Sequence, residues 1–73
     1  MSTQTIKTRY VWEAERIADE LRKEDAVIRV EGHDVKVVDL DWTLSPIHLR
    51  SICDVLQVQN AWLDGIQILC EPS

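Results

Sequence analysis

The chain has 73 residues, of which 45% are hydrophobic and 29% charged, and its formal net charge is −5. This length fits one small acidic domain spanning residues 1–73, and the apolar content argues against intrinsic disorder. All of the excess negative charge lies in residues 31–73, which hold seven acidic and two basic residues, whereas residues 1–30 hold six of each. Nucleic acids and anionic membranes attract basic surfaces, so we expect the chain to bind neither directly.

Cysteine use and the absence of a leader point to the cytoplasm. Cys53 and Cys70 are too few for a disulfide framework, and both are expected to be small core residues with reduced thiols. The sequence has no charged-then-apolar leader and no apolar run near 18 residues.

Residues 1–7 are expected to be a frayed polar start. After them, apolar residues at helical spacing predict a helix over residues 8–24 with Thr8 as its N-cap. The apolar stripe of this helix contains Tyr10, Val11, Ala14, Ile17, Ala18 and Leu21. In a competing interpretation residues 6–12 form a strand, the helix begins near Glu13, and the order is βαββαβ, as in ferredoxin-like folds. The continuous helix is preferred because no Gly, Pro, Asn or Asp interrupts the segment from Thr8 to Glu13.

Residues 26–42 predict a β-hairpin, with strands over 26–31 and 34–41 and a type II′ turn at Gly32-His33. The resulting register sets Val30 opposite Val35 and Ile28 opposite Val37, which gathers the apolar residues on one face.

Ser45-Pro46 is an N-cap followed by proline at the first helical position, and it predicts a second helix. This helix is expected to bury Leu49, Ile52, Cys53 and Leu56 and to end between residues 58 and 63, before a last strand over 66–70. The predicted fold is therefore α+β in the order αββαβ, with two helices packed on one face of a small, mostly antiparallel three-stranded sheet.

Two candidate contact surfaces follow from this fold. The second face of the hairpin carries Val27, Val38, Leu40 and Trp42, which no element of the predicted fold covers. Trp12 lies outside the apolar stripe of the first helix, and Arg16, one turn later, is placed to form a cation–π pair with it.

Residues able to carry catalysis are sparse. Asp39 and Asp41 are expected on the same side of a strand about 7 Å apart, but no third ligand or nucleophile accompanies them. His33 and His48 do not have zinc-ligand spacing with the cysteines, and no phosphate-binding glycine loop is present. We therefore expect no catalytic residues, metal or cofactor.

Three functional hypotheses follow. The first is a non-catalytic protein–protein interaction module, a homodimer or a small inhibitor or adaptor, acting through the apolar hairpin face and Trp12. The second is an acidic, phage-type inhibitor that occupies the nucleic-acid-binding groove of a host defence protein. Its acidic surface would contain Glu31, Asp34, Asp39, Asp41 and Asp64. The third, weakest hypothesis is a metal-dependent enzyme that uses Asp39 and Asp41.

Overall fold

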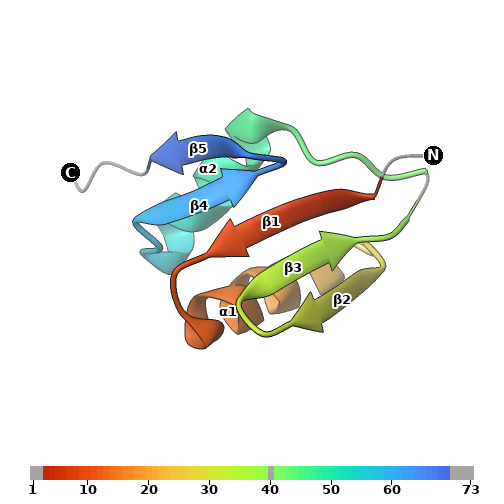
Figure 1. The fold of residues 1–73 in the computed structure, drawn as a ribbon. Coiled ribbons are helices and arrows are strands. Elements are labelled where there is room, and N and C mark those ends of the chain that lie inside the picture. Colours follow the sequence, from red (N-terminus) through yellow and green to blue (C-terminus); the bar gives the residue numbers. More distant parts are fainter. Residues whose placement is uncertain (1–2, 40, 70–73) are drawn as a thin grey trace.

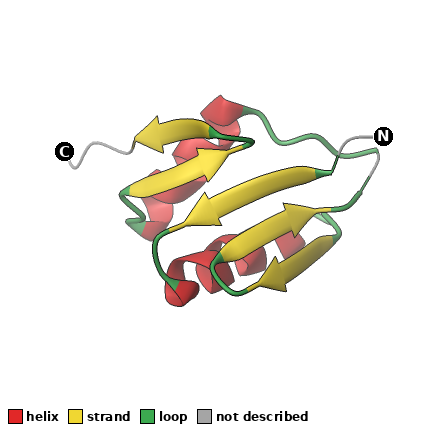
Figure 2. Ribbon diagram, in the orientation of Figure 1, coloured by secondary structure: helices red, strands yellow, loops and turns green. Residues whose placement is uncertain are grey.

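A computed structural model describes residues 3–39 and 41–69, which form two layers, a five-stranded antiparallel sheet and two helices on one of its faces (Figures 1 and 2). The helices are α1 (Val11–Arg22) and α2 (Pro46–Leu56). The strands are β1 (Gln4–Thr8), β2 (Ile28–Glu31), β3 (Asp34–Val37), β4 (Asn60–Leu63) and β5 (Ile66–Leu69). Their order across the sheet is β2-β3-β1-β4-β5.

The predicted α+β class is confirmed, whereas the three-stranded sheet and the order αββαβ are wrong. Residues 4–7, expected to fray, belong to the central strand β1, which pairs with β3 on one side and β4 on the other. Residues 8–10 precede α1 and are not helical. The competing interpretation is closer, because the order from β1 to β4 is βαββαβ and β5 adds a fifth strand at one edge.

The hairpin of β2 and β3 has the predicted register, with Ile28 opposite Val37 and Val30 opposite Val35. Gly32 has φ of +63°, and His33 is not among the residues with positive φ, which is the pattern of the expected type II′ turn. Both strands are shorter than predicted, since β2 begins at Ile28 and β3 ends at Val37.

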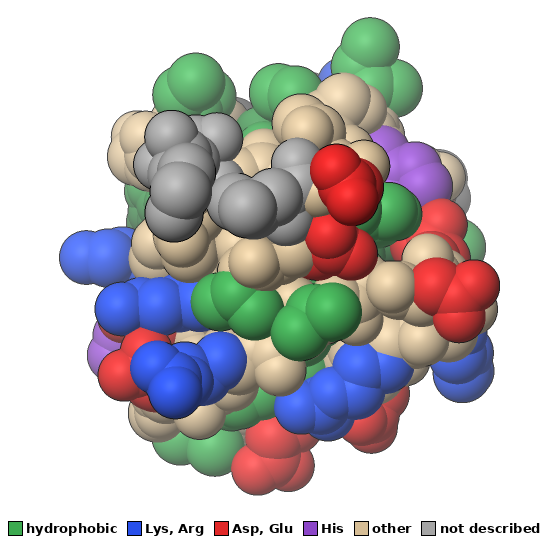
Figure 3. Space-filling model, turned by 90° about the vertical axis from the view of Figure 1, so that its right-hand side faces the viewer, with side chains coloured by type: hydrophobic (Ala, Val, Ile, Leu, Met, Phe, Trp, Pro, Cys, Tyr) green, Lys and Arg blue, Asp and Glu red, His purple; other side chains and the backbone are tan. Residues whose placement is uncertain are grey.

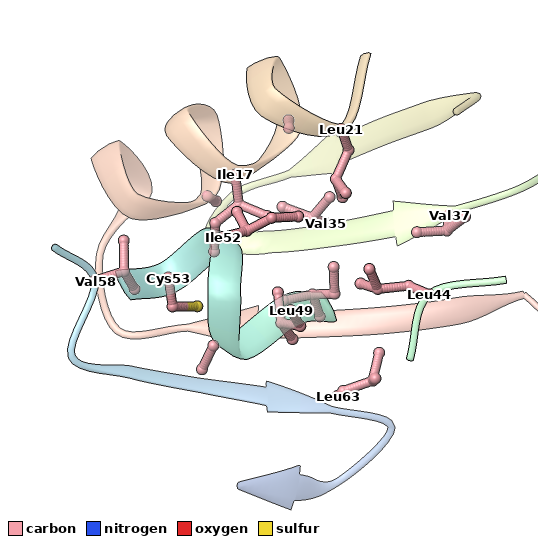
Figure 4. Close-up of a cluster of buried hydrophobic side chains, with 14 of the residues drawn as sticks. Ile17, Leu21, Val35, Val37, Leu44, Leu49, Ile52, Cys53, Val58 and Leu63 are labelled. Atoms are coloured by element: carbon pink, nitrogen blue, oxygen red, sulfur yellow. The ribbon is translucent and has the colours of Figure 1, made fainter. Parts of the chain in front are cut away.

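The hydrophobic core lies between the sheet and the two helices (Figure 4). Helix α1 contributes Ile17 and Leu21, and α2 contributes Leu49 and Cys53, all fully buried. Cys53 thus occupies the predicted core position, while Cys70 lies outside the described residues. The sheet supplies Ile6, Val35, Val37, Ala61, Leu63 and Ile68.

The connection between β3 and α2 is fixed by the side chain of Gln4. Its Nε2 donates to the Leu44 carbonyl and its Oε1 accepts from the Leu44 N–H, both at 2.8 Å. Leu44 is 2% exposed and joins the core. These two bonds hold the segment before α2 against the start of β1.

Helix α2 begins as the sequence predicted, because the Ser45 hydroxyl accepts the His48 N–H at 3.1 Å and Pro46 follows. We expect Ser45→Ala to lower the free energy of unfolding by about 1 kcal/mol, since that N–H loses its acceptor. Ser51→Ala, on the exposed side of α2, is the control and should change stability by less than about 0.5 kcal/mol in urea unfolding. Equal effects of the two substitutions would contradict the capping role.

Strand β4 occupies residues among which the sequence predicts the end of the second helix. Helix α2 ends at Leu56, because Gln57 adopts a left-handed conformation with φ of 60° and its N–H bonds back to Asp54 and Cys53. Asp64 and Gly65 also have positive φ and form the tight turn that pairs β4 with β5.

Candidate protein-binding surface

The segment between β1 and α1 is held by two buried polar side chains. The Thr8 hydroxyl lies 2.7 Å from the His33 carbonyl oxygen and 2.9 Å from that of Tyr10, and the Thr8 N–H also donates to His33. Glu13 is 4% exposed, and its carboxylate accepts the backbone N–H groups of Arg9 and Tyr10, both at 3.1 Å. The backbone before α1 is therefore tied both to the helix and to the turn of the β2–β3 hairpin.

This fixed segment exposes three consecutive hydrophobic residues. Tyr10, Val11 and Trp12 are 54%, 51% and 47% exposed. The rings of Tyr10 and Trp12 are stacked, with centroids 6.4 Å apart and planes 8° from parallel. The guanidinium carbon of Arg16 lies 5.1 Å from the centroid of the Trp12 ring, as the cation–π prediction required. We call Tyr10, Val11, Trp12 and Arg16 the aromatic cluster.

Only half of the aromatic cluster is predicted by the sequence. Trp12 and Arg16 were recognised, but Tyr10 and Val11 were predicted to lie in the buried stripe of a longer helix. Tyr10 precedes α1, which begins at Val11, and the buried residues of α1 start only with Glu13 and Ala14. The run Tyr-Val-Trp was itself a usable signal, since three consecutive large apolar residues cannot all face one side of a helix.

The predicted apolar hairpin face is only partly formed. Val27 and Val38 are exposed and lie side by side, since the Val38 N–H donates to the Val27 carbonyl at 3.0 Å. Trp42 does not lie on a strand, because β3 ends at Val37; its ring packs against the core and meets the His48 ring edge-on at 6.3 Å. Leu40 lies outside the described residues.

The five acidic residues of the second hypothesis lie at opposite ends of the sheet. Glu31 and Asp34 flank the turn between β2 and β3, whereas Asp39 and Asp41 follow the far end of β3. Asp64 lies in the turn after β4, which runs parallel to β3 and so ends on the same side as Asp39. Figure 3 shows that end of the molecule, where acidic, basic and hydrophobic side chains are intermixed.

Several of these carboxylates already have partners within the chain. Glu31 forms an ion pair with Lys36 at 3.1 Å. Asp64 accepts the Thr5 N–H at 2.9 Å. These carboxylates stabilise turns and strand pairs of the fold.

The predicted geometry of Asp39 and Asp41 is wrong, because the two residues are not in a strand. The Asp39 carboxylate instead accepts the Asp41 N–H at 2.9 Å. Across residues 3–39 and 41–69, no three His, Cys, Asp or Glu side chains are grouped so that they could hold a metal ion. His48 lies 2.9 Å from Glu24, and His33 lies 3.4 Å from Asp34.

The sheet face opposite the helices has a shallow depression that no sequence pattern predicts. It runs along β1, where Lys7 is directly opposite the half-buried Trp62 of β4. It is lined by Thr5, Lys7, Thr8, His33, Trp62, Asp64 and Gly65. This lining mixes apolar, basic and acidic groups, and it selects no single class of ligand.

The chain matches no protein-family model, no curated protein and no solved structure. Among the described residues, no helix has the length and apolar character needed to cross a membrane.

Proposed function

We propose that this chain is a non-catalytic protein-binding domain, a small inhibitor or adaptor, that contacts its partner through the aromatic cluster. The observation that supports this proposal is the exposure of Tyr10, Val11 and Trp12 in one continuous run. Trp, Tyr and Arg are the residue types most enriched among those that dominate binding energy at protein interfaces. All three types meet in this cluster.

The order of the cluster before binding also favours this function. Stacking of Tyr10 on Trp12 and of Arg16 over Trp12 restricts side chains that would otherwise lose rotamer freedom in a complex. The hydrogen bonds of Thr8 and Glu13 fix the backbone beneath them. A prearranged surface of this kind binds with a smaller entropic cost than a mobile one.

The test compares Trp12→Ala with a matched control. Val55→Ala removes another exposed hydrophobic side chain, which is 74% exposed and lies on α2, outside the aromatic cluster's own residues. Wild-type and both variant chains are immobilised and incubated with lysate of the source cells, and the retained proteins are quantified by mass spectrometry. The affinity of the protein retained by wild type is then measured by calorimetry.

We expect Trp12→Ala to weaken this affinity by about 30-fold or more, as truncation of a central interface Trp costs at least about 2 kcal/mol. Val55→Ala should leave the affinity unchanged. Both variants should fold, since Trp12 is half exposed and contributes little to the core, and circular dichroism checks this. Unchanged affinity of Trp12→Ala would refute the proposed surface.

A further inference from the structure

Within the described residues, strand β2 lies at one edge of the sheet and is hydrogen-bonded only to β3. The Val38 N–H donates to the Val27 carbonyl, and hydrogen-bonded pairs alternate along an antiparallel ladder. Arg29 and Glu31 therefore bond to β3, while the N–H and C=O groups of Ile28 and Val30 point away from the sheet. Outward-pointing groups on an edge strand are a template for another strand.

The charges on the outer face of this hairpin are poorly matched within the chain. Arg29 lies directly opposite Lys36, and Glu31 lies directly opposite Asp34. Like charges in directly opposed positions destabilise a strand pair. Glu31 offsets part of this repulsion by a diagonal ion pair with Lys36. Arg29, in contrast, has no ion pair with any described residue.

We infer that β2 pairs antiparallel with β2 of a second copy of this chain, in a register centred on Val30. Each Arg29 then lies opposite Glu31 of the other copy, so the interface contains two unlike-charge pairs. The outward N–H and C=O groups of the two Val30 residues bond to each other. The half-buried Ile28 and Val30 become covered, and the two sheets join into one.

The alternative registers are less favourable. A register centred on Arg29 or on Glu31 sets a charge directly opposite its own copy, which is repulsive. A register centred on Ile28 sets Arg29 opposite Val27 and Glu31 opposite Asp25, so no unlike charges meet. Only the Val30 register both hydrogen-bonds the outward backbone groups and sets unlike charges opposite each other.

The test is charge reversal, measured by sedimentation equilibrium of the full chain at low ionic strength from about 1 μM to about 1 mM. Arg29→Glu should weaken the dimer by about 10- to 100-fold, because two attractive pairs become repulsive. It should not harm folding, because the new carboxylate lies opposite Lys36. The double variant Arg29→Glu/Glu31→Arg exchanges the two charges and should restore the wild-type dimer.

In amide hydrogen exchange, the Val30 N–H should be protected at high but not at low protein concentration. A wild-type chain that stays monomeric over this range overturns the inference, as does a dimer that Arg29→Glu leaves unchanged. The interface is separate from the aromatic cluster and does not depend on it. A dimer lost in Trp12→Ala but kept in Arg29→Glu would instead assign self-association to the aromatic cluster.

Discussion

Replacing Ile6 by alanine is expected to lower the free energy of unfolding by about 2–5 kcal/mol, the range for truncating a fully buried aliphatic side chain. Ile6 is 0% exposed and lies at the centre of the middle strand, paired with Val35 of β3 on one side and Leu63 of β4 on the other. Small domains have only a few kcal/mol of stability, so this variant should be largely unfolded near room temperature or slightly above.

Ile47→Ala is the matched control, because Ile47 is 83% exposed at the start of α2 and loses the same atoms. Its stability should stay within about 0.5 kcal/mol of wild type in urea unfolding followed by tryptophan fluorescence. The comparison also decides between a central strand and a frayed start. If Ile6→Ala were no more destabilising than the control, the segment would not pair as β1.

Glu13→Ala is expected to cost about 2–3 kcal/mol, because two backbone N–H groups lose a charged acceptor in a buried setting. The carboxylate accepts the N–H groups of Arg9 and Tyr10, and Glu13 as a whole is 4% exposed. No other side chain in the described part of the chain accepts from these two groups. The loss should also loosen the backbone that positions Tyr10 and Trp12, so partner binding should weaken along with stability.

Glu15→Ala provides the control for this prediction. Glu15 has the same side chain on the same helix but is exposed, so its removal should change stability by less than about 0.5 kcal/mol. Thermal unfolding followed by circular dichroism measures both variants. Equal midpoints for the two would show that the buried hydrogen bonds of Glu13 do not stabilise the start of α1.

The features correctly predicted from the sequence are those with strong local signals. The hairpin register follows from strict alternation of apolar residues on both sides of Gly32, and the start of α2 follows from Ser45-Pro46. Both signals lie within a few residues of the structure that they determine. Stacking of Arg16 on Trp12 is likewise a contact between residues four apart.

A strand before the first helix was only the less favoured interpretation, because the pairing of β1 is not local. Only Ile6 and Thr8 of this strand are buried, so the alternation is short, and the partners β3 and β4 come much later in the chain. Strand propensity depends on such neighbours more than on the segment itself. Tyr10 and Val11 fit the apolar spacing of the following helix, which made a longer helix the simpler prediction.

Strand β4 had a local signal that was not used. Asp64-Gly65 is a typical two-residue hairpin turn, and it calls for a strand on each side. The candidate site was harder to predict for the same reason as β1. The exposure of Tyr10 depends on where α1 begins. The position of Trp42 outside the hairpin depends on where β3 ends and on the distant contact of Gln4 with Leu44.

The hydroxyl of Thr8 contacts both the carbonyl that opens α1 and the carbonyl in the β2–β3 turn. The aromatic cluster and the hairpin therefore share one anchor, which links them into one unit. In a dimer built through β2, two such units would present their aromatic clusters at a fixed separation. A partner with two binding sites at that separation would be held bivalently, at an effective concentration far above that of the free chain.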